Sequence, residues 1–207
     1  EIMRSACTAK ASKLTSNLKC WQFFIDLLEA QYDADSSGDK NKRETYLDQE
    51  VRDAYTRVLD LKIATPALVL NYTTFLQQKC SLYEESFRVF ERAIEMFPWP
   101  HKYEIWIQYL RVMVLRFKDT KIERVRELFA KCLRSLPDTR SPDGNFVLSQ
   151  KGQIKGQGKV FYVMYAQFEE KYGLTNHAMK IYDRALKDLT DEDCKFEIFN
   201  PYLATTT

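Results

Sequence analysis

The side chains able to carry out chemistry are few and widely separated in this chain. Its two histidines are His101 and His177, and neither has a cysteine or serine nearby in a nucleophile arrangement. Adjacent carboxylates such as Glu169 and Glu170 point about 100° apart on a helix, so they do not form an acid–base pair. The sequence also lacks a glycine-rich phosphate-binding loop. We therefore predict no enzyme activity, no catalytic residue and no cofactor.

The five cysteines are spread along the chain, and none forms a C-x-x-C pair. With two histidines in addition, this pattern disfavours a zinc site or a disulfide framework and is typical of a reducing compartment. No apolar run approaches membrane-spanning length, and no signal-peptide pattern is visible. We predict no bound metal and no membrane contact, and we expect the chain to be a fragment of a longer protein.

Lys151, Lys155 and Lys159 lie in a stretch without acidic residues and are candidate contacts for RNA phosphates or for an acidic partner. A solvated loop without a ligand is the simpler interpretation of the same stretch. The whole chain has 31 basic and 29 acidic residues, a net charge of +2, which lacks the basic excess of most nucleic-acid-binding domains.

A repeated pattern predicts how the chain folds. Clusters of the form aromatic–x–basic–small–aliphatic begin at Tyr55, Phe90, Phe129 and Tyr182, and each follows a row of large apolar residues at i, i+3 spacing. Each row lies on one helix face, so every repeat is a helix pair that must bury its apolar face against its neighbours. We interpret the aromatic residues as core rather than as a platform for base stacking. The predicted core positions are Trp21, Phe24, Tyr55, Tyr72, Phe75, Phe90, Ala93, Trp106, Tyr109, Phe129, Tyr165, Phe168, Tyr182 and Ala185.

The expected fold is all-α, a right-handed α-solenoid of antiparallel helix pairs. Thr65 should cap a helix that has Pro66 in its first turn. A polar loop is expected at 33–43, and a Gly-rich inserted loop at about 137–158. The predicted organisation is an irregular lead-in at 1–13, a single array at 14–203 with pairs at about 14–62, 66–96, 102–135 and 159–189 and a partial fifth from 195, and a tail at 204–207.

The repeat resembles the half-a-TPR (HAT) repeat. The best matches are Phe90-Glu91-Arg92-Ala93 and the stretch from Tyr165 to Glu169. Strings such as Leu59-Asp60-Leu61-Lys62-Ile63-Ala64-Thr65-Pro66 are similar to the C-terminal HAT array of the crooked-neck-like splicing scaffolds, and the likeness covers about 17–203. The chain departs from that family in a longer loop at 33–43 and in an apparent insertion at 141–159.

The resemblance implies a HAT/TPR-like, non-catalytic protein–protein scaffold in the spliceosome, of the nineteen-complex type. It further implies a nuclear protein whose partners are other spliceosomal proteins, including HAT-repeat proteins, with RNA contact secondary and no small-molecule substrate. The alternatives are a direct RNA-binding module and a HAT scaffold of another RNA-processing machine, such as mRNA 3′-end cleavage. Glu169 and Arg184 belong to the repeat motif, and we hypothesise that they pair between the two helices of one repeat.

Overall fold

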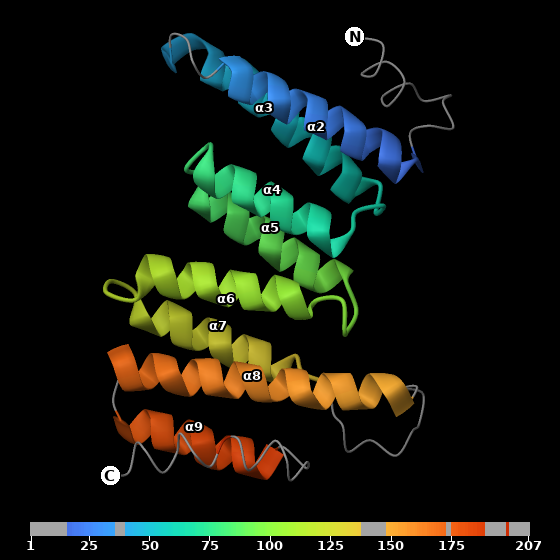
Figure 1. Ribbon diagram of the computed structural model, residues 1–207. Coiled ribbons are helices and arrows are strands. Elements are labelled where there is room, and N and C mark those ends of the chain that lie inside the picture. Colours follow the sequence, from blue (N-terminus) through green and yellow to red (C-terminus); the bar gives the residue numbers. More distant parts are fainter. Residues whose placement is uncertain (1–15, 36–39, 138–147, 173–174, 189–197, 199–207) are drawn as a thin grey trace. The chain divides into compact units, whose positions relative to one another are not determined.

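The structure, a computed structural model, describes residues 16–35, 40–137, 148–172, 175–188 and 198 (Figure 1). Long helices joined by short connections account for this part of the chain, and it contains no strand, which confirms the all-α prediction. The helices are α2 (Leu18–Asp35), α3 (Lys40–Asp60), α4 (Pro66–Gln78), α5 (Tyr83–Met96), α6 (Tyr103–Phe117), α7 (Ile122–Arg134), α8 (Leu148–Tyr172) and α9 (Thr175–Asp188).

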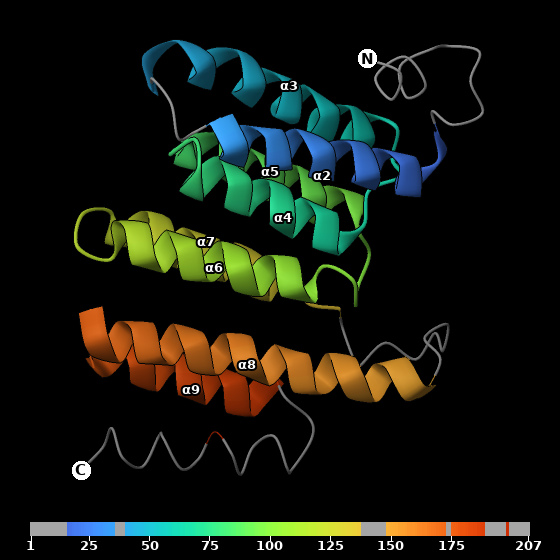
Figure 2. The same ribbon diagram turned by 45° about the horizontal axis from the view of Figure 1, so that its top comes forward.

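The helices form two compact units, Glu1–Met96 and Phe97–Thr207. The first unit contains the pairs α2–α3 and α4–α5, and the second contains α6–α7 and α8–α9. Figure 2 shows the helices of the second unit from another side, with α8 extending beyond α9. The boundary falls next to Pro98 and Pro100, which lack the N–H that a continuous helix needs. That all pairs join into the single array expected over 14–203 remains a prediction.

The second helix of a pair is amphipathic, and α7 illustrates why. Its buried residues are Val125, Leu128, Phe129, Cys132 and Leu133, which follow the i, i+3, i+4, i+7, i+8 spacing of a helix with one apolar stripe. Cys132 is fully buried at the position that Ala93 occupies in α5 and Ala185 in α9. Small side chains at this position let the neighbouring helix approach closely.

Short-range hydrogen bonds and one left-handed residue define the turn between α3 and α4. The Thr65 hydroxyl accepts a hydrogen bond from the Leu68 N–H at 3.3 Å, with proline in the first turn of α4, as predicted. At the end of α3, Lys62 has a φ of 56°, and the Ile63 N–H bonds back to the Val58 carbonyl at 3.4 Å. This left-handed closure usually employs glycine, so Lys62 adopts a backbone conformation that is costly for a residue with a Cβ atom.

Two expected loops are shorter than predicted. α8 begins at Leu148, so the prediction of a loop over 137–158 is wrong for its second half. Glycine costs about 1 kcal/mol in a helix relative to alanine, but the intervening Gln and Lys residues are good helix formers and the helix continues into the packed residues Phe161 and Tyr162. Likewise α2 runs to Asp35 and α3 starts at Lys40, within the loop expected at 33–43.

Several predictions concern residues outside those that the structure describes. They are the irregular lead-in at 1–13, the tail at 204–207 and nearly all of the partial fifth pair from 195. Ile198 is described, and its side chain is buried.

Candidate protein interface

Consecutive repeats meet through stacked aromatic rings, and the same contact occurs in both units. In the first unit, the rings of Tyr55 on α3 and Tyr72 on α4 stack with centroids 4.6 Å apart and an interplanar angle of 10°. In the second, Phe129 on α7 and Tyr165 on α8 stack at 4.7 Å and 4°. At these two junctions, the aromatic residue that opens the second-helix cluster therefore packs on the first helix of the next repeat.

The next residue in each row completes this contact. Phe75 follows Tyr72 by three residues, and its ring centroid lies 6.5 Å from that of Tyr55. Phe168 follows Tyr165 by three residues, and its ring centroid lies 5.8 Å from that of Phe129. Both pairs are tilted, by 35° and 33°. The i, i+3 spacing noted in the sequence thus supplies two successive rings for one ring of the preceding repeat.

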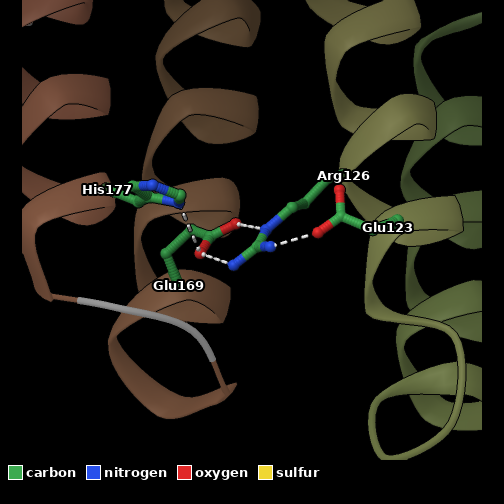
Figure 3. A network of polar contacts seen from close by, with 4 residues as sticks. All are labelled: Glu123, Arg126, Glu169 and His177. Carbon is green, nitrogen blue, oxygen red and sulfur yellow. Dashed lines mark hydrogen bonds and ion pairs between the residues drawn. The ribbon is translucent and has the colours of Figure 1, made fainter.

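An ion pair lies beside the stacked rings of the second unit (Figure 3). The Nε and Nη2 atoms of Arg126 on α7 donate to the two carboxylate oxygens of Glu169 on α8, at 2.7 and 2.8 Å. The Glu169 side chain is completely buried, whereas that of Arg126 is 20% exposed. Glu123 accepts from Arg126 Nη1 at 2.5 Å, and Nδ1 of His177 lies 3.7 Å from Glu169 Oε2. The bonds to Glu169 raise the pKa of Arg126, so the guanidinium of Arg126 is charged.

The predicted pairing of Glu169 with Arg184 is wrong. Glu169 pairs with an arginine of the preceding repeat, and Arg184 instead bonds Asp188, one turn along its own helix, at 3.2 Å. The reason is the packing of α8 between α7 and α9: the Glu169 carboxylate faces α7, while Arg184 is more than half exposed. The motif glutamate therefore joins two repeats rather than the two helices of one.

The first unit has an arginine at the matching position but a different partner. Arg52 precedes Tyr55 by three residues, as Arg126 precedes Phe129. The residue that corresponds to Glu169 is Leu76, whose fully buried side chain cannot accept a hydrogen bond. Arg52 bonds Glu85 on α5 instead, at 2.6 Å. An arginine is therefore present at both junctions. The residue at the position of Glu169 or Leu76 determines which carboxylate compensates its charge.

Tyrosine hydroxyls, rather than a pair between Glu169 and Arg184, connect the two helices of one repeat. Tyr55 on α3 donates to Glu29 on α2 at 2.6 Å, and burial followed by this bond raises the pKa of Tyr55. In the fourth repeat, Tyr162 on α8 donates to Asp188 on α9 at 2.6 Å. Tyr182 on α9 also donates, to Glu170 on α8, at 2.9 Å. The sequence placed the rings of Tyr55 and Tyr182 in the core but gave no sign of which carboxylate each hydroxyl bonds.

The predicted core residues occupy the interior of the two units with two partial exceptions. Phe24 and Tyr165 are half-buried, because each lies at the margin of its helix's apolar stripe. The others are buried, namely Trp21, Tyr55, Tyr72, Phe75, Phe90, Ala93, Trp106, Tyr109, Phe129, Phe168, Tyr182 and Ala185.

The three candidate lysines lie on a helix rather than in a loop. Lys151, Lys155 and Lys159 belong to the N-terminal part of α8, where a spacing of four residues puts them along one side of the helix. Lys159 is half-buried. The structure brings these three positions into a row, which the loop interpretation did not anticipate.

The second unit also has a groove that the sequence did not reveal. Its volume is about 660 Å³, and it lies between α6 and α8, with Phe129 of α7 contributing to the lining. The lining residues are Gln108, Arg111, Val112, Val114, Leu115, Lys118, Phe129, Met164, Gln167, Phe168, Lys171 and Tyr172.

Other classes of site find no support in the described part of the chain. It holds no cluster of three or more His, Cys, Asp or Glu side chains arranged for a metal ion. Cys20, Cys80 and Cys132 are free thiols. None of the described helices is long and apolar enough to span a membrane.

Comparison with known proteins identifies the family to which this repeat belongs. The family model described as the pre-mRNA-splicing factor Syf1/CRNKL1 C-terminal HAT repeat matches residues 3–207. The chain belongs to this HAT-repeat family. Its relatives include the syf1 homologue of Drosophila melanogaster and human SYF1, each 34% identical over 192 residues, and SYF1 of Dictyostelium discoideum, 32% identical over 191.

These alignments cover 92–93% of this chain but only 18–19% of each relative. The chain thus corresponds to about a fifth of the length of the curated relatives it matches. In HAT-repeat terms, Tyr165, Phe168 and Glu169 belong to helix A of one repeat and contact helix B of the repeat before it, through Phe129 and Arg126. At this junction, Tyr165, Phe168 and Glu169 are therefore occupied in joining two repeats.

Proposed function

We propose that this chain is part of a non-catalytic scaffold that binds other proteins within the spliceosome. The observation that carries the proposal is the family match over residues 3–207, because the relatives that share this array are named pre-mRNA-splicing factors. The fold supports it, since helix pairs that use their motif residues on one another expose long outer surfaces suited to protein partners.

The partners we infer are other spliceosomal proteins, including further HAT-repeat proteins, and the proposed location is the nucleus. Enzymatic activity is not part of the proposal. The described residues offer neither a metal-ligand cluster nor a nucleophile arrangement, and the buried carboxylate Glu169 is already bonded to an arginine.

Affinity purification of the full-length protein from nuclear extract tests this proposal. We expect splicing proteins to be recovered together, and we expect their recovery to fall when residues 16–188 are deleted from the full-length protein. Recovery of mRNA 3′-end cleavage factors in their place would support the alternative HAT machine. Recovery of neither group would contradict the scaffold proposal.

Direct RNA binding is the second candidate, and the lysine row on α8 is what favours it. If this row contacts phosphates, a triple alanine replacement of Lys151, Lys155 and Lys159 should lower salt-sensitive binding to single-stranded RNA in a filter assay. Lys131 and Lys180, both exposed and outside the row, provide a matched double replacement. We expect only weak RNA binding, because the net charge of the chain is +2.

A further inference from the structure

The groove between α6 and α8 combines an apolar base with an exposed apolar side chain. Phe129 and Phe168 are buried and form part of its base. Leu115, on α6, is 77% exposed, the highest value among the large apolar side chains that the structure describes. An isolated exposed leucine is unremarkable, but one that borders a concave apolar surface is typical of a binding site.

The charged residues of this groove all have the same sign. Arg111 and Lys118 come from α6 or its C-terminal cap and Lys171 comes from α8, whereas none of the lining residues is acidic. Basic and acidic residues are almost equal in number in the whole chain. A lining with three cations and no carboxylate therefore departs from the rest of the surface and favours an anionic ligand.

Two of these cations converge on one ring. The Nζ atom of Lys118 lies 5.8 Å from the centroid of the Tyr172 ring, and that of Lys171 lies 5.3 Å from it. The ring therefore has two positive charges near it, at one end of the groove. An acidic side chain at this end can pair with either ammonium group.

We propose that the groove binds an acidic amphipathic segment of a partner protein. Its apolar side chains would pack against Leu115 and the partly exposed Met164. Its carboxylates would meet Arg111, Lys118 and Lys171. This inference rests on the proposed scaffold function and specifies one surface that serves it. The volume of about 660 Å³ is sufficient for several side chains of such a segment.

An RNA strand fits the groove less well than a peptide does. Base stacking requires accessible ring faces, and the rings of Phe129 and Phe168 are buried. Tyr172 is half-buried, and its ring already lies near two ammonium groups. Apolar side chains also make up most of the lining, which matches a peptide with apolar residues better than a phosphate backbone.

Fluorescence anisotropy with the 207-residue chain tests the proposal. The probe is a fluorescein-labelled peptide of about four helical turns, with leucine at i, i+3, i+4 and i+7 positions and glutamate elsewhere. A second peptide has lysine in place of every glutamate, and an oligouridine of similar length represents RNA. We expect the acidic peptide to bind with micromolar affinity that weakens as salt is added, and we expect the lysine peptide not to bind.

Variants locate the binding. Leu115→Ser and the double replacement Lys118→Glu with Lys171→Glu should each weaken binding of the acidic peptide by about tenfold. Leu27→Ser, at a leucine of α2 that is 46% exposed, and Lys131→Glu with Lys180→Glu are matched controls outside the groove and should leave binding unchanged. Gln167→Glu adds a negative charge at an exposed lining position and should weaken binding without removing any packing.

The proposal is overturned if the groove variants bind the acidic peptide like the controls do, if the lysine peptide binds more tightly, or if oligouridine displaces the acidic peptide at equal concentration. Circular dichroism verifies that each variant is folded. If the lysine replacements lower stability, the affinity of Gln167→Glu for the acidic peptide tests the groove in their place. Recovery of splicing proteins from nuclear extract separates this inference from the scaffold proposal. If the groove variants recover the same splicing proteins and the wild-type chain does not bind the acidic peptide, the groove proposal is refuted and the scaffold proposal stands.

Discussion

Arg126 and Glu169 form a two-point ion pair across the junction of two HAT repeats, and the carboxylate has no exposed surface. Both charges lost water when the helices packed, and each compensates the other. The motif glutamate is therefore coupled to the stacking of Phe129 on Tyr165 in the same junction, because both contacts require α7 and α8 to pack at one register.

Removing one member of this pair should destabilise the protein strongly. Glu169→Gln removes the buried carboxylate and leaves Arg126 with only the exposed carboxylate of Glu123, so we expect a loss of about 3 kcal/mol in the free energy of unfolding by urea denaturation. The double replacement Arg126→Met with Glu169→Leu should recover most of that loss, because Leu76 occupies the corresponding position in the first unit.

Arg184→Met is the matched control for this pair. Arg184 is more than half exposed and bonds Asp188 on its own helix, so its replacement should change stability by no more than about 0.5 kcal/mol. A loss as large as that of Glu169→Gln would contradict the inter-repeat assignment and favour the original hypothesis of a pair within one repeat.

The stacked rings should contribute similarly at the two junctions. Tyr72→Leu and Tyr165→Leu retain apolar bulk but lose the ring–ring contact, and we expect each to cost about 1–2 kcal/mol in urea denaturation. Tyr72→Phe and Tyr165→Phe keep the ring and should cost much less. If the leucine and phenylalanine variants were equally stable, stacking would not explain the repeated geometry.

The thiols of Cys80 and Cys132 should react slowly with alkylating reagents in the folded chain. Burial raises the pKa of Cys80 to about 12, and burial also raises that of the fully enclosed Cys132. Because the thiolate is the nucleophile, a fraction on the order of 10⁻⁴ of Cys80 is reactive at pH 8. Iodoacetamide labelling followed by mass spectrometry should leave Cys132 unmodified in the folded chain.

Two further measurements complete this test. Unfolded protein should label at both positions, which shows that access and ionisation limit the reaction. Cys132→Ala should fold normally, since Ala93 and Ala185 occupy the same position in other repeats. Rapid labelling of Cys132 in native protein would show that α7 is not packed as described.

Glu29 should make stability depend on pH. Burial is the largest cause of its raised pKa, and the hydrogen bond from Tyr55 only partly opposes it. Since the folded state favours the protonated form, the contribution of Glu29 is fully present below its unfolded pKa of about 4.5 and is lost as pH rises through the folded pKa.

Glu29→Gln removes this titration and keeps an acceptor for the Tyr55 hydroxyl. The stability of the variant relative to wild type should therefore increase between pH 4 and pH 7, as measured by urea denaturation at each pH. A difference that is constant across this range, or one of opposite sign, would show that Glu29 does not titrate in this environment.

The sequence alone determined the class of fold, because the helical spacing of large apolar residues repeats with a small residue in each second helix. That pattern identified the α5 and α7 stripes, and the Thr65-Pro66 pair identified the cap of α4. All of these depend on residues close to one another in the chain. The likeness of the motifs to HAT repeats was equally local, and the family match over residues 3–207 agrees with it.

Only the tertiary structure decided which partners the motif residues take. Glu169 could face either neighbouring helix with the same local sequence, and packing of α8 against α7 turned it toward Arg126 instead of Arg184. The α6–α8 groove was likewise invisible, because it brings together Leu115 and Lys171, which are 56 residues apart in the chain. Periodicity specifies which side of a helix is apolar, whereas the identity of a contact depends on the position of a second helix that no local pattern records.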